Sequence, residues 1–250
     1  MIILKTREEI EKIRRACRIV AEVLARLEET VEPGVTTWDL NAMSEELAEA
    51  RGAKPAFKGY HGFPYALCTS VNEEVVHGMP SKKRVLQEGD IISIDFGVIV
   101  DGYYGDAAVT IPVGRIDDNA LRLCRVTREA LDKAIAKAMV GNRLSDISHA
   151  VQAHVEEHGF SVVREFVGHG IGRNLHESPQ IPNYGPPGRG VKLQAGMVLA
   201  IEPMINQGRP DIEILDDQWT AVTVDRKLSA HFEHTVAITA NGPDVLSVAS

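Results

Sequence analysis

The sequence predicts an α+β protein in which two pseudo-symmetric halves share a central antiparallel sheet, with helices on the outside. Three features of the 250-residue chain predict this class: two pairs of segments with helical apolar spacing, an internal repeat without gaps, and a β-hairpin signal between two apolar runs. Hydrophobic residues make up 44% of the chain and charged residues 25%, which are ordinary globular values. We therefore expect one domain over residues 1–250, with a sizeable core.

Each half is expected to begin with a pair of helices. Thr6 and Glu9 have the spacing of a capping box, and apolar residues at helical spacing follow them. In the second half, Gly159 can adopt the left-handed conformation that ends a helix. The expected helices cover residues 7–27, 37–52, 119–139 and 145–159.

An internal repeat relates the two halves. Cys17 and Cys124 are 107 positions apart (124 − 17 = 107), and many other pairs share this offset without a gap. These pairs are Arg15/Arg122, Arg18/Arg125, Glu22/Glu129, Leu24/Leu131, Gly34/Gly141, Asp39/Asp146, Glu49/Glu156 and Gly52/Gly159. Chance similarity of amphipathic helices is the alternative, but the offset continues into the strands, where Asp95 aligns with Glu202. We expect repeats over about 7–110 and 114–240, with a pocket between them.

Asp101-Gly102 between two β-rich runs predicts a tight hairpin. In that register Gly97 pairs with Asp106, and Asp95 lies on the same face because side chains alternate along a strand. Asp95 and Asp106 are then diagonal neighbours, with Cβ atoms roughly 7 Å apart. Two carboxylates facing each other in an apolar sheet resist ionisation unless a cation or a shared proton compensates. A metal ion is the simpler explanation.

Two acids of the second half repeat this pattern. Glu202 follows an apolar run, and Glu233 begins another. A single acid is more often a solvated strand end, but the repeat would direct all of these acids to one central space. His169 lies between Gly168 and Gly170, which allow a close backbone approach, although a lone histidine there is structural as often as it is a ligand. One imidazole with carboxylates suits Mn, Fe, Co or Zn better than calcium.

Charge and cysteine content argue against several classes. The net charge of −8 disfavours a nucleic-acid or anionic-membrane surface. Three cysteines without a CxxC motif disfavour a disulfide framework or a zinc ribbon. The sequence gives no signal-peptide pattern, no apolar run of about 18 residues and no coiled-coil repeat. We expect a cytoplasmic monomer that binds neither nucleic acid nor membrane.

The motifs together resemble type I methionine aminopeptidases, which share the pita-bread fold, over nearly the whole chain. The motifs are Gly59-Tyr60-His61-Gly62-Phe63-Pro64, Val71-Asn72-Glu73, His77-Gly78-Met79-Pro80, Ser93-Ile94-Asp95-Phe96-Gly97, Gly168-His169-Gly170-Ile171-Gly172, His176-Glu177, Ile201-Glu202-Pro203-Met204 and Glu233-His234-Thr235. The resemblance implies a single catalytic domain that removes the initiator methionine from nascent proteins and peptides, preferably before a small second residue.

The resemblance also implies the roles of individual residues. Two divalent ions, drawn from Co, Mn, Fe, Zn and Ni, would be held by Asp95, Asp106, His169, Glu202 and Glu233, with Asp106 and Glu233 bridging them. These ions would activate the attacking water while Glu202 moves its proton, and His77 and His176 would hydrogen-bond the peptide. The methionine side chain would enter a pocket lined by Tyr60, Phe63, Cys68, Leu175 and Trp219.

Two residues depart from the family pattern. Leu175 stands where many relatives have phenylalanine, which predicts a wider pocket or looser selectivity. His231 replaces a common glutamine and changes a contact expected near Glu233.

Two other functions stay open on the sequence alone: an Xaa-Pro aminopeptidase or prolidase, and a non-catalytic peptide-binding relative. Prolidase-like relatives usually carry a further N-terminal domain, whereas the first helix here is expected near residue 7. A non-catalytic relative should have lost a ligand, and every expected ligand is present. The same early start gives no support for ribosome docking through an N-terminal extension, and transient ribosome contact stays open.

Overall fold

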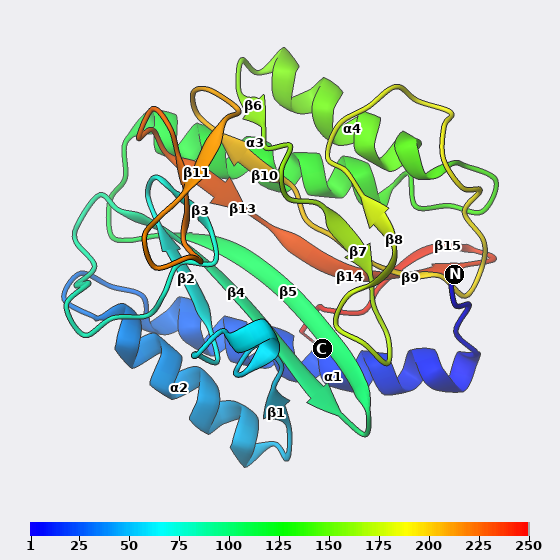
Figure 1. Ribbon diagram of the computed structural model, residues 1–250, viewed down its shortest axis with the longest axis horizontal. Helices are drawn as coiled ribbons and strands as arrows, with labels where there is room; N and C mark the ends of the chain where they lie inside the picture. The colour runs from blue at the N-terminus through cyan, green and yellow to red at the C-terminus, as the bar shows by residue number, and fades with distance from the viewer. Residues whose placement is uncertain (250) are drawn as a thin grey trace.

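The computed structural model describes residues 1–249 as an antiparallel sheet with helices on its outer face (Figure 1). The helices are α1 (Arg7–Thr30), α2 (Thr37–Ala50), the short 3-10 helix η1 (Tyr60–Gly62), α3 (Asp118–Ile135) and α4 (Leu144–Glu157). The strands are β1 (Lys54–Pro55), β2 (Cys68–Val71), β3 (Glu74–Val76), β4 (Ile91–Val100), β5 (Tyr103–Pro112), β6 (Ser161–Val162), β7 (Gly168–Gly170), β8 (Glu177–Ile181), β9 (Val198–Ile201), β10 (Met204–Asn206), β11 (Ile212–Ile214), β12 (Ala221–Thr223), β13 (Ser229–His231), β14 (Glu233–Thr239) and β15 (Gly242–Val245).

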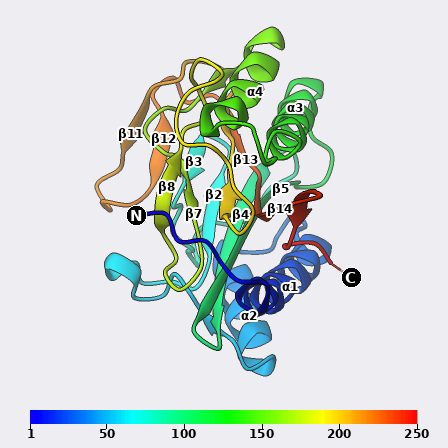
Figure 2. The same ribbon diagram turned by 90° about the vertical axis from the view of Figure 1, so that its right-hand side faces the viewer.

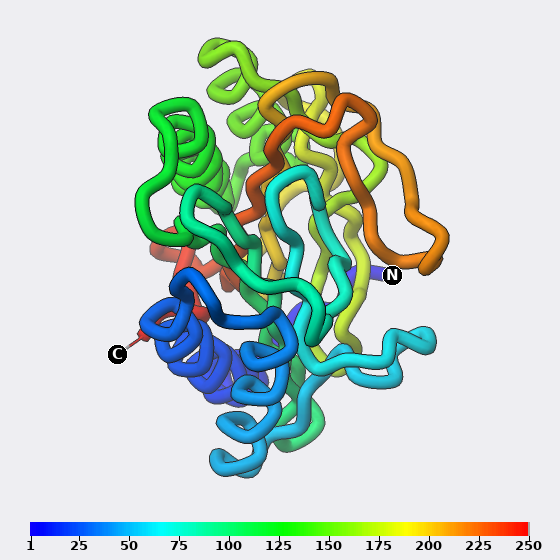
Figure 3. The backbone as a smooth tube through the Cα atoms, turned by 90° about the vertical axis from the view of Figure 1, so that its left-hand side faces the viewer, coloured from blue at the N-terminus to red at the C-terminus, as the bar shows by residue number. Residues whose placement is uncertain are grey.

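The main sheet has the strand order β1-β4-β5-β14-β9-β7-β8, with β2 paired to β4 and β15 paired to β14. Neighbouring strands in it are antiparallel, as predicted. Two smaller sheets, β13-β10-β6 and β11-β12-β3, flank it. All of the labelled α-helices lie on one side of the main sheet (Figure 2), while the β11–β12 segment and the loop containing η1 lie on the other side (Figure 3).

The helix starts follow from their capping residues, as Thr6 shows. The Thr6 hydroxyl accepts from the backbone N–H of Glu9, and the Glu9 carboxylate accepts from the backbone N–H of Thr6, so the predicted capping box is present. The predicted end of the third helix at residue 139 was wrong, because α3 ends at Ile135. There the chain tightens into turns, and Met139 and Val140, whose apolar character suggested a longer helix, are 44% and 52% exposed.

The β4–β5 hairpin has the predicted register. Val100 pairs with Tyr103, and Gly97 pairs with Asp106. Asp101 and Gly102 both have positive φ angles, 50° and 77°, as a type I′ turn requires. Asp95 and Asp106 are therefore diagonal neighbours on one face of the sheet.

Equivalent contacts recur in the two halves. The backbone N–H of Leu86 donates to the Val35 carbonyl at 2.8 Å, and 107 residues later the N–H of Leu193 donates to the Asn142 carbonyl at 2.9 Å. The pairs α1/α2 and α3/α4 each pack over the strands of their own half. These contacts support the proposed repeat.

The hydrophobic core lies between the helices and the sheet. Ile94 and Phe96 of β4 are fully buried against α1 and α2, and Leu199 and Ile201 of β9 are buried in the cluster that contains α3 and α4. Because side chains alternate along β4, Asp95 projects to the opposite face. Within residues 1–249, no helix has the length and apolar content needed to cross a bilayer.

Candidate metal centre

The predicted ligands converge from neighbouring strands of the main sheet. The contributors are Asp95 from β4, Asp106 from β5, Glu233 at the start of β14, Glu202 directly after β9, and His169 from β7. These strands are adjacent in that order, so each delivers one polar side chain to the face that the helices leave uncovered. Strand pairing thus gathers residues that lie up to 138 positions apart in the chain (233 − 95 = 138).

The side chains are close enough to share cations. Potential ligand atoms of Asp106, His169 and Glu233 all lie within 4.8 Å of one another. The Nε2 atom of His169 is 3.6 Å from Oε1 of Glu202 and 3.9 Å from Oδ2 of Asp106. Asp95 joins the group through its contact with Asp106. The structure therefore brings together all of the predicted ligands.

The carboxylates are under strong electrostatic strain. Burial raises the pKa of Asp95 to about 7 and that of Glu202 to about 8. Burial and the neighbouring carboxylates raise the pKa values of Asp106 and Glu233 well above their ordinary range. Among the described residues, Oδ1 of Asp95, Oδ1 of Asp106 and Oε1 of Glu233 are buried without a hydrogen-bond partner. Buried acceptors without donors are costly, so this donor set fits divalent cations.

His169 has the orientation that a metal ligand needs. Its Nδ1 lies 2.9 Å from the Gly170 carbonyl, and an N–H at Nδ1 donates to that oxygen. This tautomer leaves the lone pair of Nε2 directed at Glu202 and Asp106. Burial lowers the His169 pKa to about 3, so the imidazole is neutral at neutral pH, as ligation requires.

The glycines around His169 are needed for the close approach of strands. A Cβ at Gly168 would lie 2.5 Å from the Ala200 carbonyl oxygen of β9. A Cβ at Gly170 would lie 2.3 Å from the Ser178 carbonyl oxygen of β8. Only glycine lets β7 fit between these neighbours, so the expectation of close backbone approach is confirmed.

An apolar pocket opens beside the acids. It is lined by the predicted residues Tyr60, Phe63, Cys68, His77, Leu175, His176 and Trp219, together with the predicted ligands Asp95, Asp106, His169, Glu202 and Glu233. Phe63 and Trp219 meet edge to face, with ring centroids 5.2 Å apart. Cys68 is the direct cross-strand partner of Asp95, so the floor of the pocket adjoins the metal centre.

Phe57 also lines the pocket and was missed from the sequence. A Cβ at Gly97 would lie 2.9 Å from Cε1 of Phe57, so that glycine makes room for the ring. Phe57 lies only three positions before Tyr60, and this closeness to the Tyr60 motif was the available signal. An isolated phenylalanine is, however, more often a core residue than part of a binding pocket.

His176 is held by Tyr60. The Tyr60 hydroxyl lies 2.8 Å from Nδ1 of His176, and the ring centroids of His176 and His169 are 4.3 Å apart. Burial lowers the pKa of His176 below its ordinary value. A neutral imidazole that accepts from Tyr60 at Nδ1 carries its hydrogen on Nε2 and can donate it to a bound molecule.

His77 also lines the pocket and has a strained backbone conformation. Its φ of 61° is unusual for a residue other than glycine and is typical of functional loops. The ring packs edge to face with Phe166 at 5.2 Å. Burial lowers the His77 pKa to about 4, so this imidazole is also neutral at neutral pH.

The substitution at residue 231 has a local consequence. Nε2 of His231 is 3.6 Å from Oε2 of Glu202, so the imidazole faces Glu202 across the back of the centre. His231 is 1% exposed, and in the described part of the chain its Nε2 has no hydrogen-bond partner. The contact changed by this departure therefore involves Glu202.

A cluster of buried acids and a neutral imidazole beside an aromatic-lined pocket is typical of a metal-dependent hydrolase. The chain belongs to metallopeptidase family M24, whose family model matches residues 11–240. It is 54% identical to a methionine aminopeptidase of Clostridium acetobutylicum over 248 residues, covering 99% of each chain. It is also 54% identical to methionine aminopeptidase 1 of Bacillus subtilis over 247 residues, again covering 99% of each.

Solved structures with a similar fold include both methionine aminopeptidases and prolidases. The crystal structure of a methionine aminopeptidase from Thermotoga maritima matches with a TM-score of 0.98 at 53% identity, covering 99% of this chain and 100% of that one. A prolidase from Pyrococcus horikoshii matches with a TM-score of 0.79 at 26% identity, and this chain covers 64% of it. The fold is therefore the pita-bread fold, as predicted, and sequence identity favours the aminopeptidases over the prolidases.

Proposed function

We propose that the protein removes the N-terminal methionine from peptides and nascent proteins, preferably when the second residue is small. The observation that carries this proposal is the position of the pocket: an apolar, aromatic-lined cavity adjoins the buried acid cluster at Asp95. The relatives named methionine aminopeptidase, at 54% identity over nearly the full length, support the same activity.

The pocket suits a methionine side chain. Phe63 and Trp219 offer ring edges and faces to a polarisable thioether, and burial keeps the Cys68 thiol protonated by raising its pKa. With the side chain seated there, the pairing of Cys68 with Asp95 puts the substrate's α-amino group beside the acids. A peptide entering in this way presents its first carbonyl to the metal centre, which favours cleavage after one residue.

Asp95, Asp106, His169, Glu202 and Glu233 would hold two divalent ions, with Asp106 and Glu233 between them. Bound ions supply Lewis-acid polarisation of the scissile carbonyl and lower the pKa of a coordinated water. The ion in cells, drawn from Co, Mn, Fe, Zn and Ni, depends on availability as well as on these ligands.

Glu202 is proposed to move the proton during hydrolysis. Burial raises the pKa of Glu202 to about 8, and its side chain, which lines the pocket, is 14% exposed. A carboxyl group with a pKa near the working pH can both accept and return a proton. The Nε2 atom of His231 lies 3.6 Å from Oε2 of Glu202.

His77 and His176 are proposed to bind the peptide backbone from two sides. Tyr60 fixes His176 with the hydrogen on Nε2, so this imidazole donates to the oxygen that gains charge in the transition state. His77 faces the pocket next to Trp219, with ring centroids 6.5 Å apart, and narrows the space for the second residue. Leu175, 1% exposed, leaves a wider pocket wall than phenylalanine would.

Peptide cleavage tests this function directly. Met-Ala and Met-Pro peptides are incubated with metal-loaded protein beside Leu-Ala and Xaa-Pro peptides, and the products are followed by mass spectrometry. Release of methionine from the first pair, with little cleavage of the second, is expected. Preferential cleavage of Xaa-Pro peptides would replace this function with that of a prolidase, and no cleavage with any divalent ion would support a binding protein.

Cellular context is proposed as follows. The protein acts as a cytoplasmic monomer on chains leaving the ribosome, without binding nucleic acid or membrane. The three cysteines are free and buried, which supports a reducing compartment. Size-exclusion chromatography with light scattering tests the monomer, and co-sedimentation tests ribosome contact.

A further inference from the structure

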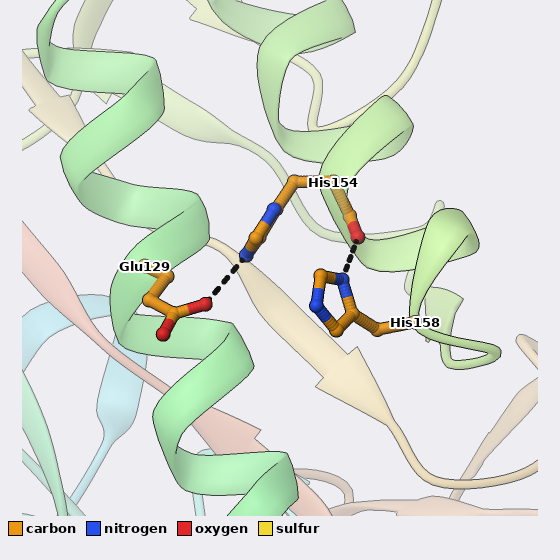
Figure 4. Close-up of side chains that lie close together, drawn as sticks. All are labelled: Glu129, His154 and His158. Atoms are coloured by element: carbon orange, nitrogen blue, oxygen red, sulfur yellow. Dashed lines mark hydrogen bonds and ion pairs between the residues drawn. The ribbon is translucent and has the colours of Figure 1, made fainter.

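A second group of metal-ligating side chains lies on the helices of the second half, away from the pocket. Figure 4 shows Glu129 of α3 with His154 of α4 and His158, the residue directly after α4. Potential ligand atoms of these residues all lie within 4.8 Å of one another. His154 and His158 are four residues apart, which puts both imidazoles on one face of α4.

The hydrogen bonds leave a free nitrogen pointing at this group. Nδ1 of His158 donates to the His154 carbonyl at 2.8 Å, so its Nε2 keeps the lone pair and faces the other two side chains (Figure 4). Nε2 of His154 lies 3.0 Å from Oε2 of Glu129. Two imidazole nitrogens and one carboxylate oxygen therefore converge from different elements.

The first half shows what a purely structural tie at this place looks like. Glu22, Leu47 and Arg51 stand 107 positions before Glu129, His154 and His158. Arg51 donates to Oε2 of Glu22 at 2.7 Å and to the Leu47 carbonyl at 3.0 Å. One guanidinium thus joins the two helices and caps the carbonyl. In the second half two imidazoles take its place, and unlike a guanidinium they have lone pairs for a metal.

We propose that Glu129, His154 and His158 form a second divalent-metal site, selective for Zn²⁺ and chemically similar ions, that links α3 to the end of α4. Two imidazoles and one carboxylate form a common zinc donor set, with a fourth position left for water. The site lies at the C-terminal end of α4, where the helix dipole favours a cation.

The cluster can contract around an ion. Tetrahedral zinc with ligand bonds of about 2.0 to 2.1 Å needs its ligand atoms roughly 3.4 Å apart. Glu129 is 40% exposed and His154 is 9% exposed, so the carboxylate is free to move while one imidazole stays fixed. Arg122 donates to the His158 carbonyl, and this nearby positive charge makes binding weaker than at the buried centre.

Zinc binding by matched variants tests the site. The double variant His154→Leu with His158→Arg installs the residue types found at the equivalent positions of the first half. There the arginine hydrogen-bonds to both helices, so the variant is expected to keep α3 packed on α4. His149→Gln, which removes an exposed histidine elsewhere on α4, is the control. Each protein is dialysed against a series of buffered free Zn²⁺ concentrations, and bound zinc per chain is measured by mass spectrometry.

The parent and the control are expected to bind one more Zn²⁺ per chain than the double variant at the same free Zn²⁺. His158→Arg alone should raise the dissociation constant of that ion at least about tenfold. Hydrogen exchange provides a second readout: Zn²⁺ should slow amide exchange over residues 154–159 in the parent and the control only. Equal zinc uptake by parent and double variant, or an equal loss in the control, would overturn the proposal. None of these readouts depends on peptide cleavage.

Discussion

Replacing Asp95 by asparagine should stabilise the metal-free protein. Asp95 is a buried carboxylate beside Asp106, and burial raises its pKa from 3.8 to about 7. In the unfolded chain it titrates near its ordinary value, so the folded state holds this proton more tightly. The stability that the proton contributes is present below about pH 4 and is lost as pH rises through 7.

The size of the effect follows from this pKa. A tenfold change in proton affinity is worth about 1.4 kcal/mol, so keeping Asp95 ionised at pH 8 costs the folded state roughly 4 kcal/mol. At pH 5 the carboxyl group is protonated in the folded state and mostly ionised in the unfolded chain. The difference in proton affinity then already costs the folded state about 1 to 2 kcal/mol relative to its stability at low pH or with a non-ionising residue. An amide does not ionise, and it can donate to the Asp106 carboxylate. The stability of metal-free Asp95→Asn relative to metal-free parent should therefore rise by about 3 kcal/mol between pH 5 and pH 8.

Urea denaturation in a chelator, followed by circular dichroism at pH 5, 6, 7 and 8, measures this difference. Adding divalent ions at pH 8 should reverse the order, because the parent regains its ligands and the variant does not. A stability difference that stays flat with pH, or a variant less stable than the parent at every pH, would show that Asp95 is not held in the environment described.

Four further substitutions give separate readouts. Asp106→Asn should lower bound divalent metal to a small fraction of the parent's content by elemental analysis, and full occupancy would remove Asp106 from its bridging role. His176→Asn should lower kcat about 100-fold or more with metal content unchanged, and Tyr60→Phe should lower it less; steady-state kinetics showing only a KM change would make both residues binding groups. Gly105→Ala should destabilise the fold by about 1 to 3 kcal/mol in urea, because the added Cβ would lie 2.5 Å from the backbone nitrogen of Cys17; equal stability would mean that α1 can shift freely over β5.

Much of the fold was predictable because its determinants are local. Thr6 with Glu9 gives the start of α1, and Asp101-Gly102 gives the hairpin with its register. Once that register is set, the shared face of Asp95 and Asp106 follows from strand alternation alone. The end of α3 was missed because Met139 and Val140 continue the apolar pattern into turns whose hydrogen bonds involve neighbouring residues only.

The sequence predicted which residues form the site better than it predicted how they are arranged in space. The order β4-β5-β14-β9-β7, which gathers the ligands, depends on long-range strand pairing that no local pattern specifies. The contact between His231 and Glu202 also arises there, and so does the packing of Phe57 against Gly97. Such contacts depend on tertiary packing, and single residues give little sign of them beforehand.

Anomalous diffraction from crystals soaked in Mn²⁺ tests the central claim, that acids from both halves converge to hold divalent cations. Two peaks are expected among Asp95, Asp106, His169, Glu202 and Glu233, with Asp106 and Glu233 contacting both. Crystals soaked in saturating Mn²⁺ that show no anomalous peak within coordination distance of Asp106 and Glu233 would contradict it.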